Sequence, residues 1–448
     1  MKKIICLILC AAFVFGLCAC SSGLSGTSST VLSKDDSTKD TGDSKVSADT
    51  DLEDLKCDDI TNVSNKMNVN EFDSEFLKYI AEKKDGNYMV SPLSFRYALG
   101  LLLAGAEGNT KTELLEALGV KSVDEWASYC TNFNGFIKWF YDQLNSESYN
   151  MPFMPADGDG ESKIDSTPKR AIRVANSIWK RENIEEDFTP DYKTHISKNY
   201  AAEYNVFTPD NAVKKINAWV NEKTEKLIPR LLPDSYNTEN LAVVLMNALY
   251  FKNNWQNPFE KFATKEDDFN AKNGQKVKKQ FMEQTEYFYY YSDKDTETVI
   301  LPMYSGVNMA FVLGDTANIG EKVSKAESAR VHVKIPKIDT ETTFDNKEFM
   351  DFLSSRGVSD AFNPKKADFS NMIDHEIWVD DIIQKTKIKT DEEGVEAAAV
   401  TAIMTNDTAM MPTEDEPIEF VADRPFSFYI YTTCDDITSM LFAGMITE

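Results

Sequence analysis

Histidine and the short motifs of hydrolytic catalysis are what this chain lacks most clearly. Its 448 residues include only three histidines, His195, His332 and His375, whose separations match neither a set of metal ligands nor a catalytic base beside its nucleophile. The chain contains no G-x-S-x-G, no P-loop and no H-E-x-x-H segment. We therefore expect a protein that is not an enzyme, with no catalytic residue, no metal site and no cofactor.

Basic residues and cysteines are also too few for two further classes of protein. Lysine and arginine total 48 against 73 acidic residues, so the formal net charge of −25 argues against nucleic acid as a partner. Of the seven cysteines, only Cys57, Cys130 and Cys434 lie beyond residue 20. That odd number, without metal-like spacing, implies no disulfide framework.

The first twenty residues have the features of an export signal. Lys2 and Lys3 precede an apolar run over 4–17 that is too short to be a comfortable membrane span. The segment that follows, LCAC, resembles a bacterial lipoprotein signal, which implies cleavage after residue 19 and a diacylglyceryl group on Cys20. The alternative is an ordinary secretory signal with a spare cysteine. The resemblance places the protein in the cell envelope, lipid-anchored and facing the extracellular side, or else in the periplasm or at the outer membrane.

Residues 20–68 are predicted to be a flexible tether. The segment is rich in serine, threonine and aspartate and has almost no apolar side chains to bury. About 45 such residues reach roughly 35–40 Å on average. A tether of this kind would hold a folded body, predicted over 69–448, away from the membrane.

The body is predicted to be mixed α+β. Helical periodicity dominates its first part, where Thr110 and Glu113 have the spacing of a capping box and Gly119 is expected to end the same helix. The segment 241–251 is continuously apolar, which is typical of a strand covered on both faces. Further strands are expected at 298–304, 308–315, 330–338, 426–433 and 440–446. The absence of a regular βαβ alternation argues against a Rossmann or barrel fold.

The segment EEGVEAAAVTAIMTNDTAM, residues 392–410, is neither a good helix nor a good strand. In an extended conformation, alternate side chains would share one face. The inner face would carry only uncharged residues: Val395, Ala397, Ala399, Thr401 and Ile403. Glu396 would point the other way, and no charge would be buried at a cost of several kcal/mol. The pattern suits an exposed loop that can become a buried strand; an alanine-rich surface helix is the alternative.

Nine segments in register across 69–448 resemble the serpins, a family of suicide inhibitors of serine proteases. They are residues 87–119, 175–180, 216–228, 243–259, 335–338, 367–372, 392–400, 420–430 and 441–446. The resemblance implies the serpin fold, with three β-sheets, about nine helices and an exposed reactive-centre loop over about 392–415. It also implies that the protein inhibits rather than hydrolyses.

The resemblance assigns a role to several residues of this sequence. The hinge of the loop comprises Glu392, Glu393, Gly394, Val395, Glu396, Ala397, Ala398 and Ala399. The gate of the central sheet comprises Ser91, Ser94, Asn247 and Gln384, with Trp255 near the point of first insertion. Two positions depart from many relatives: Gln384 replaces a frequent histidine, and Val395 replaces a commoner threonine or serine. Neither change should prevent insertion.

The resemblance also implies the position of the reactive bond, which in related inhibitors lies fourteen to fifteen residues after the hinge glycine. Counted from Gly394, this bond is Thr408–Ala409. No lysine or arginine occurs between Lys389 and Arg424, so a trypsin-like target is disfavoured. The small side chains at the bond suit an elastase-like or subtilisin-like serine protease. Cleavage after Met410 or Met411 is the competing choice. The protein is expected to be a monomer, and the alternative function is a non-inhibitory surface lipoprotein of the same fold, acting as a ligand carrier or adhesin.

Overall fold

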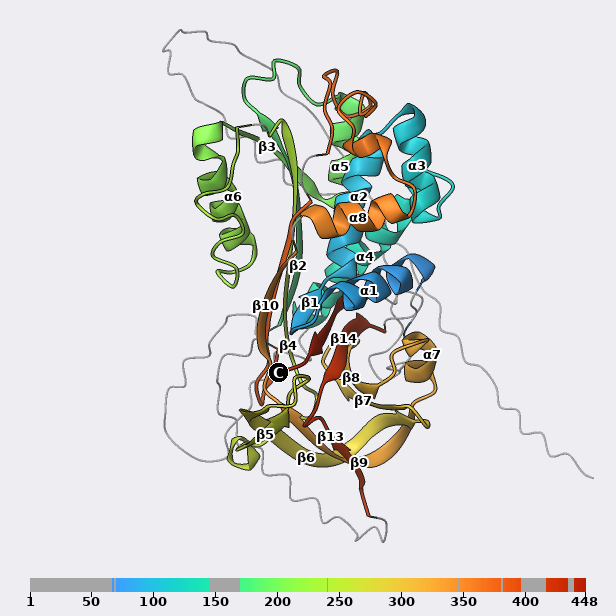
Figure 1. The fold of residues 1–448 in the computed structure, drawn as a ribbon, viewed down its shortest axis with the longest axis vertical. Helices are drawn as coiled ribbons and strands as arrows, with labels where there is room; N and C mark the ends of the chain where they lie inside the picture. Colours follow the sequence, from blue (N-terminus) through green and yellow to red (C-terminus); the bar gives the residue numbers. More distant parts are fainter. Residues whose placement is uncertain are drawn as a thin grey trace, which may run out of the picture. The chain divides into compact units, whose positions relative to one another are not determined.

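The computed structural model describes residues 67, 70–145, 170–239, 241–344, 346–379, 382–395, 416–433 and 439–448 (Figure 1). Within these ranges the chain forms eight α-helices and two short 3-10 helices, and none of the helices is both long and apolar enough to cross a membrane. The helices are α1 Glu71–Lys83, α2 Pro92–Gly105, α3 Gly108–Leu118, α4 Val123–Asn145, α5 Pro190–Tyr200, α6 Pro209–Lys223, α7 Ile319–Ser324, α8 Asn346–Ser355, η1 Lys261–Ala263 and η2 Asp360–Phe362.

The strands form three sheets. The largest has the order β1-β15-β14-β8-β7-β6-β9-β13, with β5 paired to β6. Its strands are β1 Tyr88–Val90, β5 Lys265–Asn270, β6 Lys276–Ser292, β7 Thr296–Pro302, β8 Val307–Gly314, β9 Glu327–Pro336, β13 Ile418–Val421, β14 Phe426–Thr432 and β15 Met440–Ile446. The mixed α and β content and the three sheets confirm the predicted fold class.

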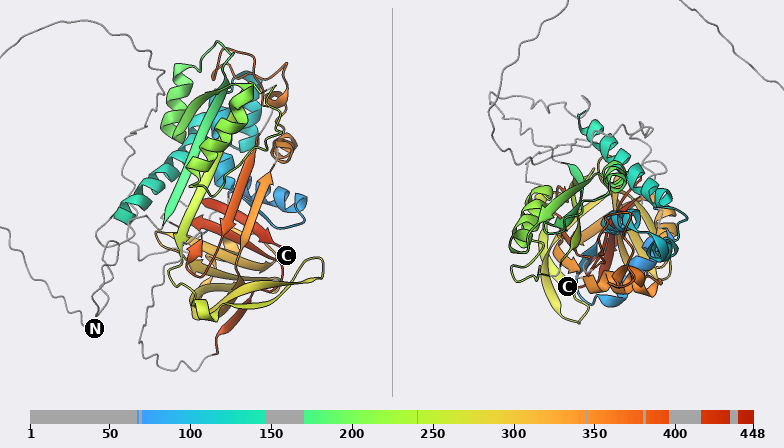
Figure 2. Two further views of the ribbon diagram at one scale, coloured as in Figure 1. Left: turned by 90° about the vertical axis from the view of Figure 1, so that its left-hand side faces the viewer. Right: turned by 90° about the horizontal axis from the view of Figure 1, so that it is seen from above.

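Two smaller groups of strands lie side by side in one layer, as the left view of Figure 2 shows. One group is β12-β4-β2-β3, formed by β12 Gly394–Val395, β4 Val243–Asn254, β2 Ala171–Arg181 and β3 Ala202–Phe207. The other is the pair β10 Asp339–Phe344 and β11 Gln384–Lys389. In the described residues no ladder joins β4 directly to β11. We call this boundary the seam.

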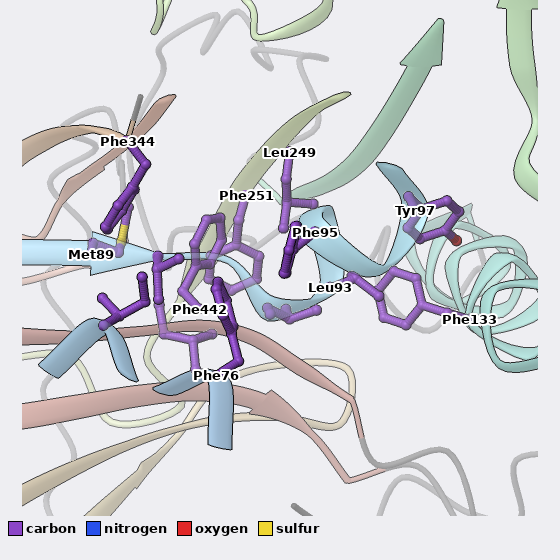
Figure 3. Close-up of a cluster of buried hydrophobic side chains, with 14 of the residues drawn as sticks. Phe76, Met89, Leu93, Phe95, Tyr97, Phe133, Leu249, Phe251, Phe344 and Phe442 are labelled. Atoms are coloured by element: carbon purple, nitrogen blue, oxygen red, sulfur yellow. The ribbon is translucent and has the colours of Figure 1, made fainter. Parts of the chain in front are cut away.

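The strand β4 has a hydrophobic core on each of its faces, as predicted for 241–251. Leu249 and Phe251 belong to the main core, which is built with α2 and the large sheet, and Figure 3 shows them beside Phe95 and Phe442. Val244 and Met246 belong to a second cluster beneath α6. Side chains alternate between the faces of a strand, so odd-numbered residues of β4 face the main core and even-numbered ones face α6. Figure 1 shows α6 and α2 on opposite sides of this layer.

The predicted capping box at Thr110 and Glu113 is wrong. The helix α3 begins at Gly108, and its N-cap residue is Glu107, three residues before Thr110. The Thr110 hydroxyl instead accepts a hydrogen bond from the backbone N–H of Asp368 at 3.0 Å. Glu113 accepts from backbone groups of the segment that leads into η2, so tertiary contacts use both side chains. The predicted end of the helix is confirmed, because Gly119 is its C-cap in the left-handed conformation.

Candidate functional site

The first turn of α2 bridges the seam. On one side, the hydroxyl of Ser94 donates a hydrogen bond to the side-chain oxygen of Asn247 on β4. On the other side, Gln384 of β11 accepts from the backbone N–H of Ser91 at 2.9 Å and donates its amide to the Ser91 carbonyl at 3.0 Å. The four residues are buried. The structure thus brings Ser91, Ser94, Asn247 and Gln384 together, and we call these four the gate.

Local sequence fixes the position of this helical turn. Ser91 is the N-cap of α2, and its hydroxyl accepts from the backbone N–H of Ser94 at 3.1 Å. Pro92 follows at the first helical position, where its missing N–H costs nothing. Gln384 satisfies both backbone groups of the N-cap residue with a single side chain. Glutamine can do this because its amide both donates and accepts.

Asn176 on β2 is a further gate residue that the sequence reading did not single out. Its side-chain oxygen accepts a hydrogen bond from the Asn247 amide, and its own amide donates to the Tyr200 carbonyl at 2.6 Å. Asn176 and Asn247 are direct partners in the β2–β4 ladder. The sequence did contain a sign of its importance, because Asn176 lies in the segment 175–180 that carries part of the family resemblance. Only the strand register, however, shows that Asn176 lies beside Asn247.

Trp255, which the sequence reading grouped with the gate, lies elsewhere. It follows β4 at the opposite end of the seam, eight residues after Asn247, a separation of roughly 26 Å along an extended strand. Its backbone N–H donates to the Glu393 carbonyl at 2.9 Å, and its indole N–H donates to the Asp391 carbonyl at 3.0 Å. Trp255 therefore contacts the hinge and not the gate, in keeping with its expected place near the point of first insertion.

The hinge is a tight turn that reverses the chain after β11. Within it the backbone groups of Asp391 and Gly394 exchange hydrogen bonds, and the Asp391 carboxylate accepts from the N–H of Glu393 at 2.8 Å and of Gly394 at 3.2 Å. Burial, reinforced by the charges of Glu392 and Glu393, raises the pKa of Asp391 against the effect of these bonds. A Cβ on Gly394 would lie 2.1 Å from the Asn253 carbonyl, so only glycine fits here.

Glu392 anchors the turn through its side chain, which is 7% exposed. Its carboxylate lies 2.6 Å from the Lys337 ammonium and accepts from the Thr264 hydroxyl at 2.7 Å. Burial raises the pKa of Glu392, but the hydrogen bonds from Lys337 and Thr264 outweigh it, and the net shift is downward. The neighbouring Glu393 pairs with Lys261 at 3.0 Å.

Val395 lies within the seam at its hinge end. It pairs with Asn253 on β4 and forms a bridge with Thr390 just beyond β11, so that it joins the two groups of strands. Its side chain is 2% exposed and belongs to the main core. The other predicted site residues, namely Glu396, Ala397, Ala398, Ala399, Thr408, Ala409 and Cys20, lie outside the described residues.

The three histidines lie on separate parts of the fold, on α5, on β9 and in the loop after η2. His332 contacts the Thr285 hydroxyl at 2.9 Å, and His375 lies 3.2 Å from the Glu186 carboxylate. Within the described ranges, no three residues among histidine, cysteine, aspartate and glutamate are grouped so that they could hold a metal ion.

Comparison with known proteins identifies the family in which this fold, with its gate and hinge, occurs. The family model for serpins, described as serine protease inhibitors, matches residues 67–448. Leukocyte elastase inhibitor of Equus caballus is 30% identical over 77% of this chain and 89% of its own length, and serpin B10 of Bos taurus is 30% identical over 81% and 94%. The crystal structure of Serpin48 from the insect Tenebrio molitor, 27% identical, superposes with a TM-score of 0.66 over 84% of this chain and 96% of that one.

These matches cover the whole predicted body, and the chain belongs to the serpin family. Its relatives are protease inhibitors and not enzymes. The gate and the hinge are thus parts of a serpin fold.

Acid should weaken the hinge through Glu392. A group whose pKa is lowered on folding adds stability above its unfolded pKa, here an ordinary value of 4.5, and that stability is lost as the pH falls through the folded-state pKa. We expect Glu392→Gln to lower the melting temperature at pH 7, and the difference from wild type to shrink below about pH 4.5. Thermal melts between pH 7 and pH 3 measure this, with the exposed Glu286→Gln as control. A difference that stays constant with pH would contradict the assignment.

Proposed function

We propose that the protein is a suicide inhibitor of serine proteases that traps the acyl-enzyme by inserting its cleaved loop into the seam. The observation that carries the proposal is the position of Val395. The first residue of the predicted inserting strand is already paired to β4 on one side and bridged to the end of β11 on the other. The residues that follow can continue along the same seam without rearranging the hinge.

The register of β12 supports this continuation. Gly394 pairs with Asn254 and Val395 with Asn253, so each further residue of the loop would meet the preceding residue of β4. On this register Ala397 would lie opposite Phe251, and Ala399 would lie opposite Leu249. Small side chains on the incoming strand would thus meet large ones already in the core, which limits overpacking.

The same register brings the loop to the gate. Thr401 would lie opposite Asn247, and counting from the bridge between Thr390 and Val395 places it opposite Gln384 as well. Its uncharged polar side chain would enter the polar layer that the gate forms. Below the gate, Ile403 would lie opposite Leu245 of β4, which packs against the main core. Thr401, the polar residue of the predicted inner face, would therefore meet the polar side chains of the gate.

The mechanism follows from this match. The protease serine attacks the Thr408 carbonyl, the amide nitrogen of Ala409 leaves with a proton, and an acyl-enzyme remains on the freed strand. Insertion of that strand gains about ten ladder hydrogen bonds at ~1 kcal/mol each, together with apolar burial. It carries the bound protease roughly 50 Å at about 3.3 Å per residue. A free energy of this size can deform an active site whose own stability is marginal.

A non-inhibitory role as a ligand carrier or adhesin is the competing function. Such a role would not require a loop that can enter the sheet, and charged or bulky residues or proline would be tolerated on its inner face. The predicted inner face here has no charge and no proline from Val395 to Ile403. That composition favours the inhibitor.

One prediction from the proposed function concerns the covalent complex and the position of the cleaved bond. Incubation with an elastase should give a complex that survives SDS, and the released peptide should begin at Ala409 by mass spectrometry. Loop cleavage without a complex at any ratio would favour the non-inhibitory role. A peptide that begins at Met411 or Pro412 would show that the reactive bond lies after Met410 or Met411, and the expected class of protease would then change as well.

Thr408→Arg should redirect inhibition toward trypsin, whose pocket requires a basic side chain.

Another prediction tests which face of the loop turns inward. Ala399→Arg would bury an unpaired charge on insertion, at a cost of several kcal/mol. Val395→Arg would place that charge in the seam already in the uncleaved protein, because Val395 is buried there. Either variant should be cleaved as a substrate and should form little complex, as measured by the ratio of the two products on a denaturing gel. Ala398→Arg, on the predicted outer face, is the matched control and should retain inhibition. Undiminished inhibition by both inner-face variants would show that the facing is reversed.

We also propose that residues 1–19 are removed, that Cys20 carries a lipid and that 20–68 tether the inhibitor to the cell envelope. The motif before Cys20 supports the anchor, because two acyl chains on one residue suffice for stable membrane attachment. Cys20→Ala should release the protein from the membrane fraction into the soluble fraction of cells, while Cys57→Ala should not. Continued membrane association of the Cys20→Ala protein would show that the lipid anchor is not at Cys20.

A further inference from the structure

The hinge turn closes without the backbone conformation that tight hairpins favour. Glu392 and Glu393 are its central residues, and the backbone N–H of Asp391 donates to the Gly394 carbonyl at 2.9 Å across its base. Two-residue hairpin loops favour turns whose first central residue has a positive φ, because the twist of these turns matches that of the strands. Neither Glu392 nor Glu393 has a positive φ. The turn therefore needs stabilisation from another source.

The side chain of Asp391 provides that stabilisation. One carboxylate oxygen accepts from the backbone N–H of Glu393 at 2.8 Å and from that of Gly394 at 3.2 Å. The backbone bond from the Gly394 N–H to the Asp391 carbonyl is longer, at 3.3 Å. Aspartate at the first position and glycine at the fourth favour a type I turn, because the short aspartate side chain can bond the backbone two residues further on. The side chain thus closes a turn that the backbone alone would hold weakly.

The turn fixes the position of Val395 in the seam. Val395 pairs with Asn253 of β4, forms a bridge with Thr390 and is 2% exposed. The indole N–H of Trp255 donates to the Asp391 carbonyl at 3.0 Å and holds the start of the turn against the end of β4. Asp391 therefore connects the end of β4 to Gly394, the residue that precedes Val395.

The negative charge of Asp391 contributes nothing favourable to this arrangement. Burial, reinforced by the charges of Glu393 and Glu392, raises the pKa of Asp391, so the folded protein disfavours its ionised form. The two cations of this region pair with the neighbours instead, since Lys337 lies 2.6 Å from the Glu392 carboxylate and Lys261 3.0 Å from that of Glu393. Asparagine could accept the same hydrogen bonds without the cost of the charge. The turn depends on the acceptor oxygen and not on the charge.

We propose that Asp391 is a positioning residue for loop insertion, because its side-chain oxygen holds the hinge turn closed and keeps Val395 in the seam. The inference rests on the proposed function, and it adds to that function a residue that touches neither the protease nor the reactive bond. The role requires an acceptor one methylene from the backbone, which aspartate and asparagine have and glutamate lacks. An open turn would delay insertion and give water more time to hydrolyse the acyl-enzyme.

The test compares two variants that separate the acceptor oxygen from the charge. Asp391→Asn keeps the acceptor and loses the charge, whereas Asp391→Glu keeps the charge and carries its oxygens one methylene further out. We expect Asp391→Glu and Asp391→Ala to raise the stoichiometry of inhibition of an elastase roughly two- to tenfold, the effect of one or two lost hydrogen bonds. Asp391→Asn should restore it to within about twofold of wild type. Asp374→Ala, which changes an exposed aspartate in the loop after η2, is the control.

Hydrogen exchange reports the turn directly in the uncleaved protein. A peptide that contains residues 391–395 should exchange faster in Asp391→Glu than in wild type, because the N–H groups of Glu393 and Gly394 lose an acceptor. Exchange of this peptide should stay slow in Asp391→Asn. Peptides from β14 and β15 should exchange alike in all variants, which distinguishes a local effect on the hinge from a general loss of stability.

Thermal melts identify the contribution of the charge. A group whose pKa is raised on folding disfavours the folded state while it is ionised, and this cost disappears below its ordinary value of 3.8. Asp391→Asn should therefore melt at a higher temperature than wild type at pH 7, and the difference should shrink as the pH falls toward 3.8. At pH 7 this difference is opposite in sign to the one expected for Glu392→Gln.

These measurements distinguish failure of the positioning role from failure of the proposed function. If wild type forms no covalent complex, the proposed function fails and the positioning role fails with it. If wild type forms the complex, but Asp391→Glu and Asp391→Ala keep its stoichiometry, Asp391 is not a positioning residue and the inhibitor remains. An equal rise in Asp391→Asn would also overturn the role, because the charge would then be the property that matters. So would faster exchange throughout the Asp391→Glu protein, because Asp391 would then support the whole fold.

Discussion

The hydrogen bonds that the first turn of α2 makes to both sides of the seam are the interaction on which the site depends. Ser94 holds Asn247, and Ser91 is held by Gln384, so one helix end links two strands that no ladder joins in the described residues. All of these groups are buried, and a buried polar group that loses its partner costs about 1–3 kcal/mol. On the proposed insertion, opening the seam would therefore require an incoming residue that replaces these bonds. A polar residue on an inserting strand meets that requirement.

Much of the fold could be predicted from the sequence because its signals are local. The continuous apolar run in 241–251 predicted a strand covered on both faces, and β4 has a core on each face. Gly119 predicted a helix end because a left-handed cap favours glycine. The family resemblance added what local signals cannot supply, namely that Ser91 and Ser94 lie together with Asn247 and Gln384, which are far from them in the chain.

The features that could not be predicted depend on contacts between distant segments. Thr110 and Glu113 fit a capping box, yet both bind the segment around η2, since a tertiary partner can outcompete a local one of similar strength. Asn176 became a gate residue only through the β2–β4 register.

The tight turn from Asp391 to Gly394 has a consequence for how fast the loop could move. It joins the end of β11 to Val395 in a hairpin whose closing step is already complete, so an inserting strand would only extend it. Each further pair would then close a loop of only a few residues, so the entropic cost of every step is small. Hairpins zip in roughly 1–10 μs, whereas enzymes typically turn over about 1–1,000 times per second. A strand that extends an existing hairpin can therefore finish its travel well within the lifetime of an acyl-enzyme.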